Sequence, residues 1–474
     1  MADSKKEVLG EQGIYDAKTL GTPKMLVLGL QHMFAMFGST VLVPLITGLS
    51  VSATLLFAGV GTLLFHLITK RKVPAFLGSS FAFLAGYGTI AGLAIAKSNG
   101  ELMTQAELLP YACFGVALAG LLYLVLAILF KVFGANHVMK FFPPIVTGPI
   151  IIAIGLNLSQ SAINSCSSNW PIALVAIVAI IICNIWGKGM IKILPILIGV
   201  VASYLVAAVT GNVDFSGVAE AAWIGLPVKY SNTVFSIFTN GADGALLATA
   251  AITIMPIAIA TMMEHIGDIS AISSTVNRNF IKDPGLHRTL TGDGLATTIA
   301  SLFGAPANTT YGENTGVLTL TRVFDPFVIR LAAGFAIIMS FCPKFSAIIE
   351  AMPSATVGGI SLVLYGMISA VGVRNIVETQ VDFTKSRNVI VAALILVLSI
   401  GINFSSAGAI SFAVGGANIS LSGLAVGSLV GIILNAILPG KDFNFNEDTG
   451  SETGADLSGI SEKEIKDEPK EEKK

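Results

Sequence analysis

Charged residues are scarce in this sequence. Asp, Glu, Lys and Arg make up 12% of its 474 residues, whereas a soluble globular domain contains about 25%. Hydrophobic residues account for 53%, and the mean hydropathy is +0.78. Apolar runs recur from Leu26 to Leu438, and about 20 such residues in a helix span the bilayer core. The composition excludes an ordinary soluble domain and predicts an all-α polytopic membrane protein.

Signatures of several other protein classes are also missing. The formal net charge is −1, with no basic stripe or zinc-finger spacing, which argues against a nucleic-acid partner. The four cysteines are scattered without a CxxC pair and are expected to be small buried hydrophobic residues. No His, Cys and Asp set has metal-ligand spacing, and there is no P-loop or GxSxG. The sequence therefore predicts no metal, no cofactor and no catalytic residue.

Both ends of the chain are polar. Residues 1–23 mix charges and contain no signal peptide. Residues 439–474 are rich in Asp, Glu, Lys and Ser, a composition typical of a solvated, disordered segment. We expect both to be cytoplasmic tails.

The basic residues indicate how many spans there are. With fourteen spans and both termini in the cytoplasm, fifteen basic residues fall in cytoplasmic loops and three in external loops, as the positive-inside rule favours. The cytoplasmic set is Lys70, Arg71, Lys72, Lys131, Lys140, Lys188, Lys192, Arg278, Lys282, Arg288, Arg322, Arg330, Arg374, Lys385 and Arg387, and the external set is Lys97, Lys229 and Lys344. The spans are expected, to within about four residues, at 24–46, 53–70, 76–96, 109–131, 141–158, 170–187, 191–211, 245–267, 287–303, 308–321, 328–343, 354–372, 387–403 and 419–438.

A long external loop, 212–244, separates seven spans from seven. An odd number in each half inverts the second half relative to the first, as in secondary transporters whose site lies at the midplane between repeats. The third span opens with residues 77–83, LGSSFAF, and the tenth with residues 307–313, ANTTYGE. Both openings are short polar interruptions of apolar segments. The first and eighth spans likewise pair Gln31-His32 with Glu264-His265.

Glu313 stands between long apolar stretches, where a carboxylate is costly and is retained mainly for function. Its neighbours Gly312, Asn314, Thr315 and Gly316 are poor helix formers. A Gly-interrupted segment of this kind is typical of a discontinuous transporter helix, whose freed backbone groups hold a polar ligand. The sequence thus predicts a membrane carrier with a carboxylate-centred site.

Glu264 and Asp268 lie four residues apart at the end of the eighth span and share a helical face. Glu264 either binds substrate or a coupling proton, or is merely solvated at the cytoplasmic interface; Asp268 lies closer to the polar loop. Glu264 and Glu313, from opposite repeats, could face one cavity and hold a planar ligand that offers N–H donors. Burying two like charges makes one of them a candidate proton carrier.

Four other residues allow two interpretations each. His32 and His265 sit on apolar helices beside polar partners, where proton coupling competes with a simple interhelical hydrogen bond. Phe81 could stack on a ligand or pack in the core. Tyr365 could pack or line a gate.

The motifs resemble those of the nucleobase–ascorbate transporters, and within that family the bacterial uracil permease branch. Residues 313–321 fit the family pattern (Gln/Glu)-Asn-x-Gly-x4-Thr. The likeness covers nearly the whole chain apart from about the first twenty residues and the tail. It is carried by residues 31–44, QHMFAMFGSTVLVP, residues 77–83, residues 264–268, EHIGD, and residues 308–316, NTTYGENTG.

The resemblance implies about fourteen transmembrane helices in two inverted seven-helix repeats, with short extended stretches in spans 3 and 10. It implies a multi-pass protein of the cell membrane, the bacterial inner membrane, and a possible homodimer formed through gate helices. The helices would divide into a core domain, spans 1–4 (24–140) and 8–11 (245–345), and a gate domain, spans 5–7 (141–211) and 12–14 (346–438).

Site residues follow from the same resemblance. Glu264 and Glu313 would hydrogen-bond a pyrimidine ring, and the backbone N–H groups of Phe81 and Gly312 would meet its carbonyl oxygens. The remaining implied residues are Asn314 and His32 as support, Ser39, Tyr311 and Tyr365 as lining, and Glu264 with His265 and Asp268 as the proton-linked or supporting group.

Two positions indicate the substrate. Purine-transporting relatives usually have Gln in place of Glu313 and often Gly in place of Arg322, so the resemblance implies a proton-coupled uracil symporter that imports its substrate by alternating access. A purine (xanthine or urate) or ascorbate symporter of the same family remains an alternative. An anion transporter or channel on the same fold would need a basic residue at the half-helix N-termini, and Arg322 lies too near the cytoplasmic end. An intramembrane enzyme would need a nucleophile–base pair, which the sequence lacks.

Overall fold

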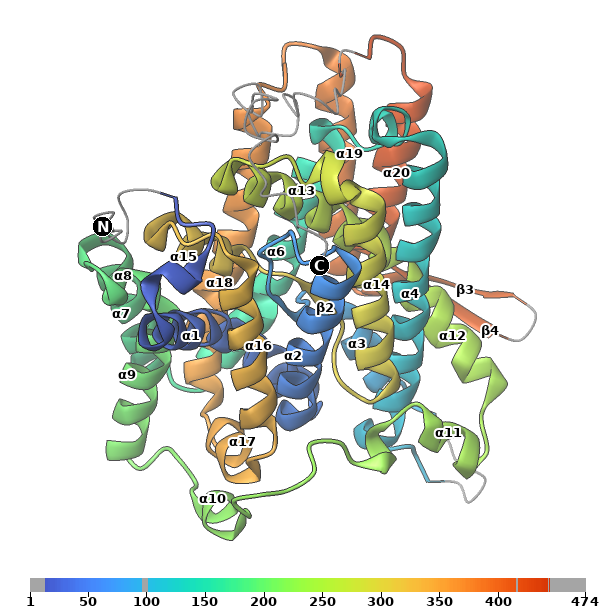
Figure 1. Ribbon diagram of the computed structural model, residues 1–474. Helices are drawn as coiled ribbons and strands as arrows, with labels where there is room; N and C mark the ends of the chain where they lie inside the picture. The colour runs from blue at the N-terminus through green and yellow to red at the C-terminus, as the bar shows by residue number, and fades with distance from the viewer. Residues whose placement is uncertain (1–12, 96–100, 415–416, 442, 444–474) are drawn as a thin grey trace, which may run out of the picture.

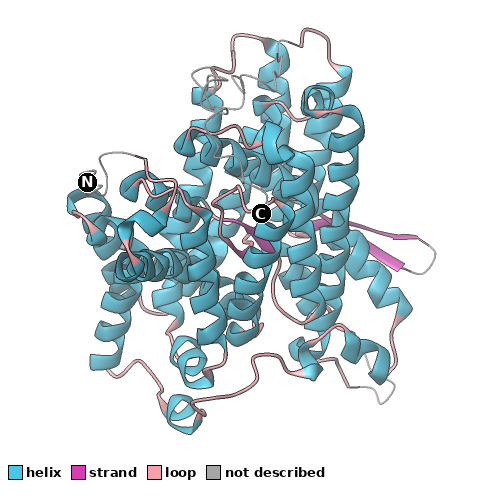
Figure 2. Ribbon diagram, viewed as in Figure 1, coloured by secondary structure: helices cyan, strands magenta, loops and turns pink. Residues whose placement is uncertain are grey.

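The computed structural model describes residues 13–95, 101–414, 417–441 and 443, so most of both predicted tails lies outside the described residues. The helices dominate, with two short strand pairs among them (Figure 2). The first part of the chain contains α1 Thr22–Thr47, α2 Val51–Ile68, β1 Leu77–Ser79, α3 Leu84–Ala91, α4 Gln105–Phe133, α5 Ala135–Val138, α6 Pro144–Cys166, α7 Trp170–Trp186, α8 Met190–Ile193, α9 Pro195–Val209 and α10 Ser216–Glu220. The second part contains α11 Phe235–Asn240, α12 Gly244–Ile254, α13 Ala258–Val276, α14 Leu286–Leu302, β2 Asn308–Thr310, α15 Gly312–Thr321, α16 Pro326–Ser340, α17 Pro343–Glu350, α18 Ser354–Glu378, α19 Ser386–Asn403, β3 Ala409–Val414, β4 Ala417–Ser422 and α20 Gly423–Ile437.

Seven helices among the described residues are long and apolar enough to cross a membrane, or eight if α16 and α17, bent by 87°, form one span. Three shorter apolar helices, α7, α9 and α20, accompany them. Eleven of the predicted spans overlap one of these elements. Span 9 coincides with α14, which is not among them, and spans 3 and 10 are not continuous helices. Each begins as a strand and continues as a half-helix, α3 or α15. The chain is therefore a helical multi-pass membrane protein.

The eighth span is longer than predicted. The sequence suggested 245–267, but α12 and α13, joined by a 3-10 turn at Met255–Ile257, continue to Val276. Ser270 and Ser273 bond back to carbonyls one turn earlier, which lets polar residues continue a helix that hydropathy alone would end. Glu264 and Asp268 consequently lie well inside a helix and not at its end.

The last predicted span begins at Gly423, within the margin of about four residues around its predicted start at 419. The segment before it forms the antiparallel hairpin of β3 and β4, in register from Ala409↔Ser422 to Val414↔Ala417. This hairpin projects from the bundle beside α12 (Figure 1). The sequence contains its signal, two alternating runs separated by a Gly-Gly pair, which the span prediction overlooked.

The helices pack in matched pairs (Figure 1). In one group, α14 packs on α4 as α16 packs on α2, and α12 contacts α4 as α1 contacts α16. In the other group, α7 packs on α9 as α19 packs on α20, and α18 packs extensively on α6. Exchanging each helix of the first part of the chain for its counterpart in the second part therefore converts one contact of each pair into the other.

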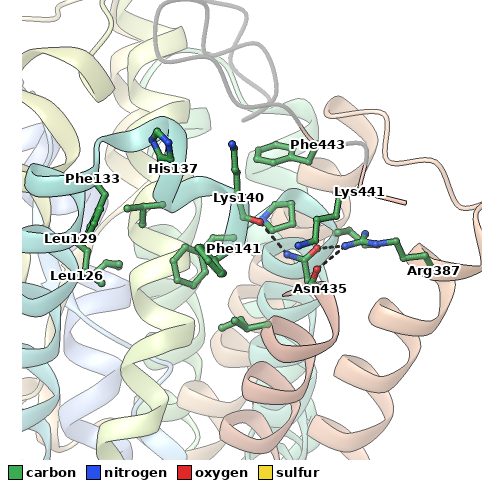
Figure 3. A pocket seen from close by; sticks show the side chains of 15 residues that line it. Leu126, Leu129, Phe133, His137, Lys140, Phe141, Arg387, Asn435, Lys441 and Phe443 are labelled. Carbon is green, nitrogen blue, oxygen red and sulfur yellow. Dashed lines mark hydrogen bonds between the residues drawn. The ribbon is translucent and has the colours of Figure 1, made fainter. Parts of the chain in front are cut away.

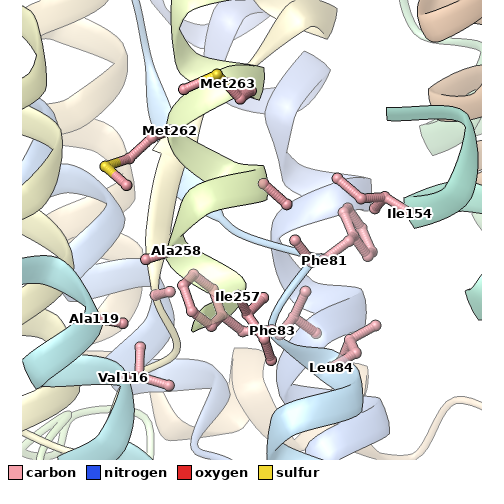
Figure 4. Close-up of a cluster of buried hydrophobic side chains, with 14 of the residues drawn as sticks. Phe81, Phe83, Leu84, Val116, Ala119, Ile154, Ile257, Ala258, Met262 and Met263 are labelled. Carbon is pink, nitrogen blue, oxygen red and sulfur yellow. The ribbon is translucent and has the colours of Figure 1, made fainter. Parts of the chain in front are cut away.

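Small residues allow the closest helix contacts. A Cβ placed on Gly120 of α4 would lie 2.7 Å from the Gly294 carbonyl oxygen of α14, and one on Gly294 would lie 2.6 Å from the Gly120 carbonyl oxygen. Backbones that approach this closely are typical of helix packing in membranes, where van der Waals contact drives association. Beside this contact, buried apolar side chains from the start of α3, from α4 and from α13 form one cluster, including Phe83, Val116 and Ala258 (Figure 4).

Candidate functional site

Two short strands cross at the centre of the molecule. β1 and β2 pair antiparallel, with Leu77 opposite Thr310 and Ser79 opposite Asn308. The ladder continues at both ends, because the Ser80 N–H donates to the Ala307 carbonyl (2.8 Å) and the Tyr311 N–H donates to the Phe76 carbonyl (3.0 Å). The half-helices α3 and α15 follow the two strands. This crossing brings together the two polar interruptions predicted from the sequence.

Threonines of two neighbouring helices satisfy the outer backbone groups of the crossing. The Thr62 hydroxyl of α2 accepts from the Leu77 N–H (2.9 Å), and the Thr297 hydroxyl of α14 donates to the Asn308 carbonyl (2.8 Å). The Asn308 amide in turn donates to the Phe57 carbonyl (2.9 Å). Non-helical backbone at membrane depth persists only where protein groups satisfy it, so these side chains maintain the extended segments.

Tyr311 stabilises the crossing from one side. Its hydroxyl donates to the Ser79 carbonyl (2.8 Å), while the Ser79 hydroxyl donates to the Thr40 carbonyl of α1 (2.7 Å). The tyrosine ring lies over Gly78, where a Cβ would come within 2.5 Å of it. Tyr311 therefore packs within the crossing. Residue 78 must be glycine because the Tyr311 ring leaves no space for a side chain, a requirement that the sequence analysis did not predict.

The first turn of α15 faces open space. Gly312 is exposed, a Cβ on it would meet nothing within 4 Å, and the side chain of the N-cap residue Tyr311 makes no capping hydrogen bond to this end of the helix. The leading N–H groups of a helix lack intrahelical acceptors and carry partial positive charge. Phe81, on the opposite strand connection, is buried, and its N–H donates to no described backbone acceptor. The crossing thus offers backbone donors from both repeats.

α13 carries two acidic residues, and one of them contacts the crossing. Glu264 and Asp268 are both half-buried, and Asp268 accepts a hydrogen bond from the Thr310 hydroxyl of β2 (2.7 Å). Glu313 is the second residue of α15, and its side chain lies outside what the structure describes. The backbone nevertheless places Glu313 at the start of the half-helix whose companion strand Asp268 contacts.

His265 points the other way. Its Nδ1 lies 2.7 Å from an Asp293 carboxylate oxygen on α14, and both side chains are completely buried. The Phe65 ring meets the imidazole edge-on at 6.3 Å between ring centroids. Asp293 was missed in the sequence, although an acid in the Gly-Asp-Gly of an apolar span is the same signal that singled out Glu313.

On the far side of α15, Asn314 joins α15 to α1. Its amide contacts the His32 ring at Nδ1 (3.2 Å) and donates to the His32 carbonyl (3.1 Å), and both residues are buried. Ser39 of α1 is also fully buried, one residue before the Thr40 carbonyl that holds Ser79. His32 therefore makes the interhelical contact that was one of its two predicted roles.

An aromatic pair joins the two helix groups. The Phe81 ring meets the Tyr365 ring of α18 edge-on, with centroids 5.7 Å apart, and both are buried. Phe81 follows β1 in the group of α1, α2, α4, α12–α14 and α16, whereas α18 belongs to the group of α6, α7, α9, α19 and α20. The two helix groups therefore touch each other through this ring contact, close to the crossing.

Broken helices, a polar crossing at their centre and acids beside it define the class of this protein, a helical membrane transporter. Among the residues that the structure describes, no cluster of His, Cys, Asp and Glu could hold a metal ion.

Comparisons identify the family. Residues 23–408 match the permease family, and the chain belongs to it. It is 40% identical over 444 residues to the uracil permease of Bacillus caldolyticus, covering 90% of this chain and 94% of that one. It is 40% identical to the uracil permease of Bacillus subtilis (92% and 96% covered) and 35% identical to that of Escherichia coli K12 (86% and 90%). The family resemblance predicted from the motifs is confirmed, and the protein is a permease, not an enzyme.

Solved structures share the fold at low sequence identity. The transmembrane domain of the cyanobacterial bicarbonate transporter BicA matches with a TM-score of 0.56 at 14% identity, covering 90% of this chain and 99% of that domain. SLC26A9 matches with a TM-score of 0.61 at 14% identity, covering 89% and 66%. These likenesses concern the fold alone.

Proposed function

We propose that this chain is a uracil permease that imports its substrate together with protons. The observation that carries the proposal is the 35–40% identity to relatives named uracil permeases over about nine-tenths of the chain. The crossing adds a chemical reason. Uracil is planar, with N–H donors and carbonyl acceptors along its edge. The crossing has backbone N–H groups, and the Asp268 carboxylate accepts a hydrogen bond from Thr310 of β2.

In this proposal Glu264 and Glu313 accept the ring N–H groups through a carboxyl oxygen, which can accept a hydrogen bond whether the group is ionised or protonated. The N–H groups of Phe81 and Gly312 donate to the uracil oxygens. Asp268 is held by Thr310 and orients the β2 end of the site. The position of Gly312 in open space, at a helix end without a capping hydrogen bond from the Tyr311 side chain, supports this assignment.

Proton coupling is assigned to Glu264, with His265 as its neighbour on α13. A proton that binds to Glu264 removes a charge from a region of low dielectric constant, so proton occupancy and substrate occupancy favour each other. The buried contact between His265 and Asp293 fixes the face that α13 turns toward the crossing. Asp293 is therefore a positioning residue in this proposal, acting through α13.

We further infer fourteen spans in two inverted repeats, with both termini in the cytoplasm. The matched helix pairs support the repeats, as do Thr62 and Thr297, which perform the same task for β1 and β2. The core would comprise the group containing the crossing, and the gate the group of α6, α7, α9 and α18–α20. Alternating access would move one group against the other at the contact between Phe81 and Tyr365. The homodimer implied by the family stays a prediction.

A fold shared with a bicarbonate transporter also fits an anion carrier. The acidic residues at the crossing disfavour an anion, because two carboxylates would repel it. A purine or ascorbate symporter would share the fold and the family, so the substrate must be tested directly.

The test is uptake of radiolabelled uracil into proteoliposomes, with and without an inward proton gradient. Wild-type protein should take up uracil in a gradient-dependent way. Glu264→Gln and Glu313→Gln should each lose at least tenfold in uptake, and Glu220→Gln, an exposed glutamate of α10, should match the wild type. Uptake of xanthine or bicarbonate in place of uracil would refute the substrate. Uracil uptake that ignores the gradient would refute the coupling alone.

A further inference from the structure

A pocket of about 740 Å³ opens where four helix ends meet. α4 ends at Phe133, α6 begins at Pro144, α19 begins at Ser386 and α20 ends at Ile437. The connection 134–143 forms one rim (Figure 3). The pocket therefore lies between α4, from the group that contains the crossing, and α6, α19 and α20 from the other group. Helix ends of this kind mark the boundary between hydrocarbon and headgroups.

Apolar side chains form most of the pocket wall. Leu126, Leu129 and Phe133 of α4 lie on one side (Figure 3), and Ile432 of α20 also lines the pocket. Leu129 and Phe133 are exposed, at 39% and 59%, on a surface that a hydrocarbon chain would cover. The volume falls within the range of cavities that enclose a small organic ligand.

Three cations stand at one rim of the pocket, Lys140, Arg387 and Lys441 (Figure 3). Arg387 donates to both the backbone and the side-chain oxygen of Asn435, whose amide donates to the Lys140 carbonyl (3.2 Å). Lys441 donates to the Ala436 carbonyl (2.9 Å).

All of these acceptors are neutral. Within the described ranges no carboxylate pairs with any of the three cations, and the Arg387 Nε–H is buried without an acceptor. The rim therefore keeps its positive charge, and Asn435 holds the guanidinium in place.

We propose that this pocket binds one anionic phospholipid, with its phosphate at Lys140, Arg387 and Lys441 and an acyl chain along α4 and α20. The apolar wall of the pocket matches the acyl chain of such a lipid, and the uncompensated cations at the membrane boundary match its phosphate. Basic pockets between transmembrane helices bind anionic headgroups. A free anion would gain nothing from the apolar wall, and a neutral lipid would gain little from the rim. The site is independent of uracil recognition and connects two helix groups whose relative position alternating access would change.

The test is lipid retention measured by native mass spectrometry. Full-length protein is reconstituted in phosphatidylcholine nanodiscs and titrated with phosphatidylglycerol of the same acyl chains. Wild-type protein should retain one phosphatidylglycerol in preference to phosphatidylcholine. Each surface cation contributes about fivefold to the binding of an anionic lipid, so Lys140→Gln/Lys441→Gln should bind about 25-fold more weakly while Arg387 and Asn435 stay paired. Lys188→Gln/Lys192→Gln, which removes two exposed cations from another connection, should bind as the wild type does.

A second variant separates a pocket from a merely charged surface. Ile432→Trp keeps all three cations but puts a larger side chain into the apolar lining of the pocket, and it should also lose phosphatidylglycerol. Retention by this variant would overturn the pocket. Equal loss in the two double variants would overturn the rim assignment, and displacement by inorganic phosphate would show an anion site without a lipid. Retention only after residues 444–474 are deleted would assign the pocket to the chain's own C-terminal segment and refute the lipid.

Discussion

The buried contact between His265 and Asp293 leads to a quantitative prediction about stability. The two side chains are completely buried and 2.7 Å apart, so removing one leaves the other without its partner in a region of low dielectric constant. Breaking a buried pair in this way costs about 3–5 kcal/mol, whereas replacing both members with apolar residues of similar size is often neutral or stabilising. Asp293→Leu and His265→Phe should each lose about that much free energy of unfolding. The double variant should be more stable than either single one by at least about 3 kcal/mol.

The assay is denaturant unfolding of purified protein in micelles, arranged as a double-mutant cycle. Losses that simply add in the double variant would refute the pairing. Uracil uptake by the double variant then separates two roles. If Asp293 only positions α13, the recovered fold should recover uptake and its dependence on the proton gradient. If the pair carries the proton, uptake should lose its gradient dependence although stability has returned.

Two further variants test the crossing. Thr310→Val removes the hydroxyl that donates to Asp268, and a hydrogen bond to a charged group is worth about 1.5–3 kcal/mol. The affinity for uracil, measured by calorimetry, should therefore fall by roughly tenfold or more. The control Thr319→Val, whose exposed hydroxyl bonds only within its own helix, should bind uracil as the wild type does. Gly78→Ala places a methyl group 2.5 Å from the Tyr311 ring and should lower the free energy of unfolding by about 1–3 kcal/mol. The control Gly88→Ala, where a Cβ meets nothing within 4 Å, should leave the free energy of unfolding unchanged. Equal free energies of unfolding in the two alanine variants would contradict the packing at Gly78.

The sequence predicted the positions of the helices well because hydropathy and basic residues report directly on the membrane. It also located both polar interruptions and the acids beside them. It did not predict that residues 77–79 pair with residues 308–310, because a register between segments far apart in the chain depends on how the whole bundle packs. Hydropathy also ended the eighth span too early, because it does not register serine hydroxyls that bond within their own helix.

The sequence also did not predict which way the side chains of α13 point. Glu264 and His265 are neighbours in the sequence, and His265 faces Asp293 of α14. A helical periodicity separates them by about 100°, but which face meets the site depends on the position of α14. Asp293 could have been found by applying to residues 287–303 the rule applied to Glu313.

The strand pair at the crossing also has a consequence for how the protein is made. Residues 77–79 pair as a strand with residues 308–310, which are synthesised much later, although the Leu77 N–H also bonds to Thr62 of the neighbouring α2. At about 5–20 residues per second, the ribosome needs roughly ten to fifty seconds to synthesise the chain between them. During that interval the first strand is in or near the bilayer with several amide and carbonyl groups unpaired, each costly in hydrocarbon. The third segment should therefore be the last of the early segments to insert fully into the membrane, and it should stay hydrated until the tenth segment is synthesised. The strand pair at the crossing and the complete fold should then form in the same step.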